Sequence, residues 1–394
     1  MLQQSAENKK VSDFGKKIRY IPLETNDYSL VGNRPNIKVL RNFIIIESGG
    51  YRFNGQGNCL LFNKENGHFI AEIGHYGQDP SAFTNNFSWT DDKEEFLYFE
   101  RYPNQLIKYD MKGNFCGKVE FAPPGLALYY LITNSEIIGY FNDPWSTSQY
   151  ILGFYDKDGI LKDTIPPLAP IIELERGGVA YTQGGINNSY FKGVGIWSLG
   201  GTFSRSFNNI YDLQLIFGKA PRIWKNNENI RFKADFVDTL YTITESNLIP
   251  AIVFFTGKYH WPIEEQTKSA GINNNRIFIA AVSEINDFVF FQCVSGLLPD
   301  GPRPNSVVLY NGLYNKETGE TKLSKHGEGI EDDINHFMPF TPLGISSDGE
   351  FVSMVEAWSV MEWFEKHPEA LNNENLSFLE KFDEEMNPIV ILLE

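Results

Sequence analysis

Dense apolar runs recur along the chain, each starting directly after one polar residue. Both faces of a strand built from such a run would be buried, as in strands packed between neighbouring sheets. Six runs of this kind begin after Asn42, Glu95, Glu136, Asn229, Asp287 and Glu350. The pattern predicts six sheets with a similar internal order.

A second repeat, of hairpin type, follows these runs. It joins two strands through a turn rich in Asn, Asp and Gly, residues that tolerate the positive φ values of tight hairpins. Clear copies span residues 60–69, 106–115 and 152–161, and weaker copies span 240–244 and 313–320. The turn residues Asn63, Asp110 and Asp156 are 47 and 46 positions apart. A period of this length is typical of β-propeller blades.

The last repeat has one late strand, at residues 388–393, and its missing outer strand is available at residues 17–23. Pairing the two would satisfy both exposed strand edges and close the fold. Pro22 fits there, because an outermost strand has a free N–H side. We therefore predict an all-β, six-bladed propeller of four-stranded antiparallel blades, closed by pairing of the N-terminal and C-terminal strands.

We expect a flexible polar leader at residues 1–15 and one propeller domain at residues 16–394. The run at residues 195–201 is interpreted as an insertion between blades three and four, with a seventh blade as the alternative. A helical insert is predicted in the last blade, at about residues 358–385. Pro368 suits the first turn of a helix there, and Ser377 with Glu380 forms a capping-box pattern. This insert either packs across the outer surface or docks a partner.

Charge and cysteine content narrow the function classes. The net charge of −16 repels phosphate backbones, so we expect no nucleic-acid partner. Cys59, Cys116 and Cys293 lack metal-type spacing and form no disulfide framework. No apolar run is long enough for a transmembrane helix, and residues 1–10 do not resemble a signal peptide. The protein is then either cytoplasmic or preceded by a targeting segment that this sequence lacks. We expect a monomer.

Sequence motifs of catalysis are absent. The chain has no nucleophile elbow, zinc-protease helix, phosphate loop or dinucleotide fingerprint, so no catalytic residue and no cofactor are predicted. Asp332, Asp333 and His336 lie in an oxygen-rich loop whose chemistry suits Ca²⁺. The loop lacks the ligand spacing of a calcium site, and its carboxylates would equally well accept backbone hydrogen bonds.

Ligand-binding residues are expected where inner strands and their entry loops approach the propeller axis. Flat aromatic rings there would stack on the apolar face of a sugar. The candidates near the axis are Arg34, Trp89 and Arg222; two further candidates lie on loops between strands, Arg101 within reach of the rim and Trp145 in a turn-rich segment. For each tryptophan the alternative is packing between blades.

Several sequence segments resemble motifs of a family of six-bladed β-propeller proteins from anaerobic gut bacteria, with TolB-like and NHL-like architecture. They are residues 73–80, 238–243 with 249–251, 332–335 with Phe337 and Pro339, and the ends 21–24 and 387–390. His336 stands where the family pattern has glycine, and the region 177–217 departs from it. Many members are secreted lipoproteins without an established common activity. The resemblance thus implies export to the periplasm or cell surface, with residues 2–10 as the tether after a lipidated cysteine that this sequence does not contain.

The sequence favours a non-catalytic recognition module that binds a glycan, peptide or protein at one face of the propeller. One alternative is a hydrolase or lyase that uses axial carboxylates, with or without a metal. The other is a structural scaffold that docks a partner through the helical insert.

Overall fold

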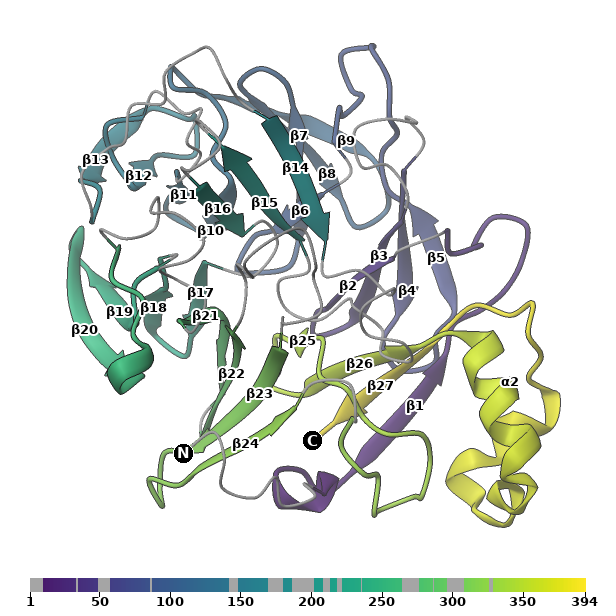
Figure 1. The fold of residues 1–394 in the computed structure, drawn as a ribbon. Coiled ribbons are helices and arrows are strands. Elements are labelled where there is room, and N and C mark those ends of the chain that lie inside the picture. The colour runs from purple at the N-terminus through teal and green to yellow at the C-terminus, as the bar shows by residue number, and fades with distance from the viewer. Residues whose placement is uncertain are drawn as a thin grey trace. The chain divides into compact units, whose positions relative to one another are not determined.

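A computed structural model describes most of the chain. The described residues are 10–32, 35–48, 57–85, 87–141, 148–168, 180–185, 202–207, 213–217, 222–234, 236–263, 276–285, 287–295, 308–325 and 329–394. They form six four-stranded antiparallel sheets and one sheet of three strands (Figure 1). The predicted six-bladed β-propeller is confirmed.

The chain divides into two compact units, one from residues 7–120 and 328–394, the other from residues 121–327. The first unit holds three four-stranded sheets. Their strands are β2 (Asn36–Val39), β3 (Phe43–Ser48), β4 (Asn58–Asn63) and β5 (Phe69–Glu72); β6 (Ser88–Thr90), β7 (Phe96–Arg101), β8 (Gln105–Asp110) and β9 (Phe115–Glu120); and β1 (Ile18–Pro22), β27 (Ile389–Leu393), β26 (Phe351–Val355) and β25 (Gly344–Ile345).

The second unit holds the other three four-stranded sheets and the three-stranded one. Its strands are β10 (Tyr129–Ile132), β11 (Ile137–Tyr140), β12 (Leu152–Tyr155) and β13 (Leu161–Ile165); β14 (Ala180–Gly185), β15 (Thr202–Phe207) and β16 (Leu213–Phe217); β17 (Ile223–Asn226), β18 (Asn229–Phe232), β19 (Thr239–Thr244) and β20 (Asn247–Val253); and β21 (Ile277–Glu284), β22 (Phe288–Ser295), β23 (Val308–Asn315) and β24 (Thr321–Lys325). The three-stranded sheet occupies the region predicted to be an insertion, whereas residues 195–201 lie outside the described residues.

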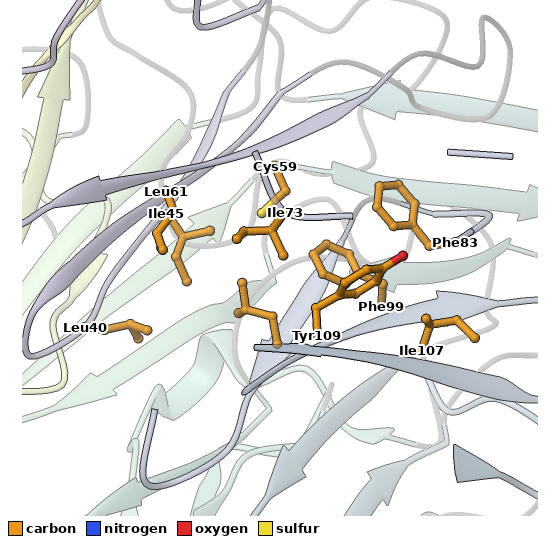
Figure 2. Close-up of a cluster of buried hydrophobic side chains, with 10 residues drawn as sticks. Leu40, Ile45, Cys59, Leu61, Ile73, Phe83, Phe99, Ile107 and Tyr109 are labelled. Atoms are coloured by element: carbon orange, nitrogen blue, oxygen red, sulfur yellow. The ribbon is translucent and has the colours of Figure 1, made fainter. Parts of the chain in front are cut away.

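Each of the six predicted apolar runs forms the second strand of a four-stranded sheet: β3, β7, β11, β18, β22 and β26. Second strands are central, with a neighbouring strand on either side, and most residues of β3, β7, β11 and β26 are buried. In the first unit, the sheets β2–β5 and β6–β9 share a core of Leu, Ile, Phe and Tyr side chains (Figure 2). Ile45, Leu61 and Phe99 are fully buried in it. Burial of such side chains stabilises the fold by about 1.5–3 kcal/mol each.

The predicted turns are held by their own Asn and Asp side chains. Oδ1 of Asn63 accepts hydrogen bonds from the backbone N–H of Glu65 and of Asn66, at 2.8 and 3.2 Å. Gly67 follows with a φ of 72°, which glycine adopts without a Cβ penalty. Turn residues of this kind explain why the hairpin repeat was visible in the sequence.

The terminal strands pair as predicted, with β1 outermost beside β27 (Figure 1). Ile18 lies opposite Leu393, and Pro22 lies opposite Ile389. The buried Asn387 secures the corner before β27: its Nδ2 donates to the carbonyl oxygens of Glu24 and Ser29, at 2.7 and 2.8 Å. These bonds tie the last residues to the chain that follows β1.

Part of the expected leader has defined contacts. Residues 1–9 lie outside the described residues, but Val11–Asp13 forms a short 3-10 helix, η1, and Val11 is fully buried. The backbone N–H of Val11 donates to the carbonyl of Glu331 at 2.9 Å. The chain before β1 is thereby held against the loop around residue 331.

The helical insert comprises α2 (Ala357–Lys366), η4 (Pro368–Asn372) and η5 (Glu374–Lys381). Pro368 occupies the first turn of η4, as predicted. The predicted capping box at Ser377 is wrong, because Ser377 lies inside η5 and Asn373 caps that helix through a hydrogen bond from the backbone N–H of Asn375. Helix η5 lies against β1. None of the helices in the described residues is long and apolar enough to cross a membrane.

Candidate functional site

A pocket of about 650 Å³ lies in the first unit, between the loop at residues 332–337 and the helical insert. This volume falls within the range of roughly 300–1,000 Å³ typical of small-ligand sites. The pocket is lined by Asn335, His336, Trp363, His367, Glu369, Ala370, Asn372, Asn373, Glu374 and Asn375. Most of these side chains are polar but uncharged.

One wall of the pocket is aromatic. Trp363 and His367 are four residues apart at the end of α2, a spacing that brings side chains together on one helix face. Their rings stack with centroids 4.8 Å apart and an interplanar angle of 28°. The ring of Phe337 meets Trp363 edge to face at 4.9 Å, so the loop and the insert are in direct contact.

Another part of the lining is a network of asparagine amides. Asn375 Nδ2 donates to Oδ1 of Asn335 at 2.9 Å, and Asn373 Nδ2 donates to the backbone carbonyl of Asn335 at 3.1 Å. Asn335 is only 5% exposed and in turn donates to the hydroxyl of Tyr20 at 3.2 Å. These bonds fix the position of the pocket wall before any ligand arrives.

Asp332 holds the loop at residues 332–337 through hydrogen bonds to its carboxylate. Its Oδ1 accepts hydrogen bonds from the backbone N–H groups of Ile334 and Asn335, and its Oδ2 accepts from the Tyr20 hydroxyl. Asp333 accepts from the backbone N–H and the hydroxyl of Ser12, at 3.0 and 2.6 Å. The two carboxylates thus accept backbone hydrogen bonds, which was the expected alternative to metal binding.

A cation bound by Asp332 and Asp333 would have to displace these donors. The described residues contain no group of three or more His, Cys, Asp or Glu side chains that could hold a metal ion. His336, the third residue of the predicted metal set, instead lines the pocket with a φ of 54°. Residues other than glycine adopt this conformation at a cost of about 1–2 kcal/mol.

The electrostatic character of the pocket is mildly acidic. Glu369 and Glu374 contribute carboxylates, and the lining contains no lysine or arginine. Nδ1 of His367 lies 3.2 Å from Oε1 of Glu369. A hydrogen bond from its own backbone N–H, followed by that of His367, lowers the pKa of Glu369 below its ordinary value. Glu369 is therefore ionised at neutral pH.

The ligand-binding candidates from the sequence are not brought together at this pocket. Trp89 is 4% exposed on β6, with its ring 5.2 Å from that of Phe87. Arg101 donates to the carbonyl oxygens of Gln78 and Ala82, so it holds the loop before β6.

Arg222 is 2% exposed and donates to the carbonyl of Ala280 at 3.2 Å. Arg34 and Trp145 lie outside the described residues. Where the structure describes the candidates, Arg101 and Arg222 donate to backbone carbonyl groups of the scaffold, and the ring of Trp89 is buried.

Sequence reasoning missed Trp363, His367 and the asparagines at residues 372, 373 and 375. The i, i+4 spacing of Trp363 and His367 was available as a signal, as was the unusual density of asparagine after Pro368. Only His336 of the predicted set lines the pocket.

Comparisons with known proteins give a family and a similar fold. A family model described as a domain of unknown function (DUF4934) matches residues 2–394. A protein of Bacteroides fragilis NCTC 9343, named as an inferred exported protein, has a similar structure, with a TM-score of 0.60, 17% identity, and coverage of 96% of this chain and 94% of that one. A member of the DUF4221 family from Bacteroides vulgatus ATCC 8482 gives a TM-score of 0.49 and 11% identity, with 96% of both chains covered. No curated protein matches the chain in sequence.

Proposed function

The chain belongs to the DUF4934 family, a domain of unknown function, and on that premise we propose that it is an exported, non-catalytic recognition module. It binds its ligand in the pocket between the loop at residues 332–337 and the helical insert. The observation that carries the proposal is a preformed pocket whose lining combines a stacked aromatic pair with a network of asparagine amides.

Preorganisation supports binding as the role of this pocket. Loop and insert are already joined by the contact of Phe337 with Trp363 and by the bonds of Asn335 with Asn373 and Asn375. A ligand that enters such a site meets side chains that are already ordered. Binding therefore does not lose the free energy that ordering these side chains would cost.

The pKa of Glu369 and the hydrogen bonds of Asp332 and Asp333 support recognition over hydrolysis. Glycoside hydrolysis needs one carboxyl group that stays protonated and donates its proton to the leaving group, which requires a raised pKa. The pKa of Glu369 is lowered instead. The loop carboxylates of Asp332 and Asp333 are held by backbone and hydroxyl donors.

Export is the second part of the proposal. It draws on the fold shared with the inferred exported protein of Bacteroides fragilis and on the resemblance to secreted lipoproteins. The site of action is then the periplasm or the cell surface, with residues 2–10 as the tether that follows a lipidated cysteine. Protease treatment of intact cells and of spheroplasts tests this part: a surface or periplasmic protein is digested in one of these preparations, and a cytoplasmic protein survives in both.

The pocket itself is tested with the purified chain on printed glycan and peptide arrays. The variant Trp363→Ala removes the aromatic wall, and Trp358→Ala is its matched control, because Trp358 lies on the same helix, is 59% exposed and does not line the pocket. We expect array binding that is lost in Trp363→Ala and retained in Trp358→Ala. If binding is lost in Trp358→Ala alone, the scaffold alternative is favoured. If binding is unchanged in both variants, the pocket is rejected as the binding site.

A further inference from the structure

We infer that the ligand of this pocket is an uncharged oligosaccharide. The inference rests on the proposed function, since it names the ligand class of the same site. It follows from three properties of the lining: its charge, its hydrogen-bonding groups and its aromatic surface.

The charge of the lining selects against acidic ligands. Two carboxylates, those of Glu369 and Glu374, face the pocket, and no lysine or arginine lines it. The chain as a whole carries a net charge of −16, so its field repels anions at longer range as well. Phosphorylated, sulfated and uronic-acid ligands are therefore disfavoured, whereas a neutral ligand is not affected.

The hydrogen-bonding groups suit hydroxyls. Amides and imidazoles both donate and accept, and carboxylates accept, so together they match a ligand whose every hydroxyl does both. Within the part of the chain that the structure describes, the side chains of His336, Asn372 and Glu374 make no hydrogen bond or ion pair with other residues. These three side chains line the pocket and are available to a ligand.

The aromatic surface suits the C–H face of a sugar ring. Trp363 and His367 are held rigidly by their stacking and by the edge contact from Phe337. Flat, rigid rings add contact area at a low cost in conformational entropy. A pyranose can lay its apolar face on such a surface while its equatorial hydroxyls reach the asparagines around it.

A peptide fits the same lining less well. Two common modes of peptide recognition use an exposed sheet edge, which supplies backbone hydrogen bonds, or apolar pockets that anchor side chains. The lining residues lie in a loop, α2, η4 and η5, and none belongs to a strand. Trp363 and Ala370 are the apolar residues among them. The pocket therefore offers neither of these two peptide anchors.

The inference is tested by isothermal titration of the full chain with neutral oligosaccharides: xylo-, manno-, cello-, malto- and chito-hexaoses. Oligogalacturonate serves as the acidic arm, and a random-sequence peptide library as the peptide arm. We expect one or more neutral sugars to bind, and Trp363→Ala to weaken that binding tenfold or more. Asn372→Ala is expected to weaken it about three- to tenfold, the value of one hydrogen bond. Trp358→Ala is expected to leave the Kd unchanged.

A charge variant separates the ligand classes without relying on loss of the aromatic wall. Glu374→Gln keeps the shape and removes one negative charge. For a neutral sugar, the ionic-strength dependence of Kd stays flat in both proteins; for a cationic ligand, Glu374→Gln weakens binding and the salt dependence is steep. Far-UV circular dichroism and melting temperature show that each variant is folded.

The two proposals fail in different ways. Binding of the peptide library or of oligogalacturonate that Trp363→Ala abolishes, without binding of any neutral sugar, overturns the ligand class and leaves the recognition pocket standing. Binding that persists in Trp363→Ala and Asn372→Ala overturns the pocket itself. Absence of binding in all three arms overturns both.

Discussion

The hydroxyl of Tyr20 donates a hydrogen bond to Oδ2 of Asp332, with 2.7 Å between the two oxygens. Tyr20 belongs to the closing strand β1, and Asp332 begins the loop that lines the pocket. The ring of Tyr20 also lies 5.1 Å from that of Phe337, edge to face. The strand that completes the last blade therefore supports the candidate site directly.

Replacement of Tyr20 by Phe tests this support. The variant keeps the ring but leaves one oxygen of the buried Asp332 without its hydroxyl donor, so the free energy of unfolding should fall by about 1–3 kcal/mol. Burial, followed by the hydrogen bond to Asp332, raises the pKa of Tyr20, so the hydroxyl remains a donor across the ordinary pH range. Urea titration measures the loss. Tyr28→Phe is the control, because Tyr28 is 80% exposed; an equal effect of both variants would contradict the role of Tyr20.

Substitution of Gly67 and of Gly349 by alanine tests whether the turn at Gly67 is packed against the closing strand β1. Both have positive φ, 72° and 86°, but a Cβ on Gly67 would collide with the carbonyl oxygen of Pro22, whereas nothing lies within 4 Å of one on Gly349. Gly349→Ala should cost about 1–2 kcal/mol from backbone conformation alone. Gly67→Ala should cost roughly 1–3 kcal/mol more, because the strand must shift. Equal losses in thermal unfolding would show that the turn and β1 do not press on each other.

Stability in acid should depend on Glu350. Burial raises the pKa of this carboxyl, but hydrogen bonds from Lys64, Ser346 and Arg19 outweigh burial, and the pKa lies below its ordinary value of 4.5. A lowered pKa in the folded state means that the stabilisation is present above about pH 4.5 and is lost as the pH falls through the folded pKa. Glu350→Gln should be less stable than the natural chain at pH 7 by roughly 2 kcal/mol.

The difference between Glu350→Gln and the natural chain should shrink on acidification. Urea unfolding at pH 7, 5, 4 and 3 follows it, and a constant difference would refute the assignment. Glu362→Gln is the control, because its partner Lys366 is also exposed and solvent screens the pair.

Glu356 is expected to show the opposite pH dependence. It stands at the N-cap of α2, where the helix dipole favours a negative charge, yet burial raises its pKa. A raised pKa of a carboxyl means that its ionisation costs stability, and that this cost appears as the pH rises through the folded pKa. Glu356→Gln should therefore raise the melting temperature at pH 8 and have little effect at pH 4. A variant that melts lower at pH 8 would show that the charge at the N-cap outweighs burial.

The fold was predictable because its strongest features are local. Each apolar run after a polar residue became a central strand, and turn residues such as Asn63 and Gly67 marked the hairpins. The pairing of β1 with β27 followed from a count of strands, since one blade lacked a partner and one terminal strand was unassigned. The error at Ser377 arose because Asn373 competes for the cap from four residues upstream.

The pocket was harder to predict because its parts are far apart in the sequence. Asn335 meets Asn373 and Asn375 only after the insert has folded back on the loop. Trp89 was chosen as a ligand-binding candidate but is buried. The sequence placed a tryptophan near the start of a strand and could not show that its ring faces the core. Residue type indicates what a side chain can bind, and tertiary packing decides whether it is exposed to do so.

The antiparallel contact of Ile18 with Leu393 also has a kinetic consequence. A ribosome synthesises β1 before β27 and before the other strands of the described residues, so β1 waits as a bare edge until β27 has been made. Joining ends this remote carries a large loop entropy and makes the step late and slow. During that wait the unprotected edge is open to β27 of another copy, and exchange of this single strand between molecules is the misassembly that crowded synthesis would favour.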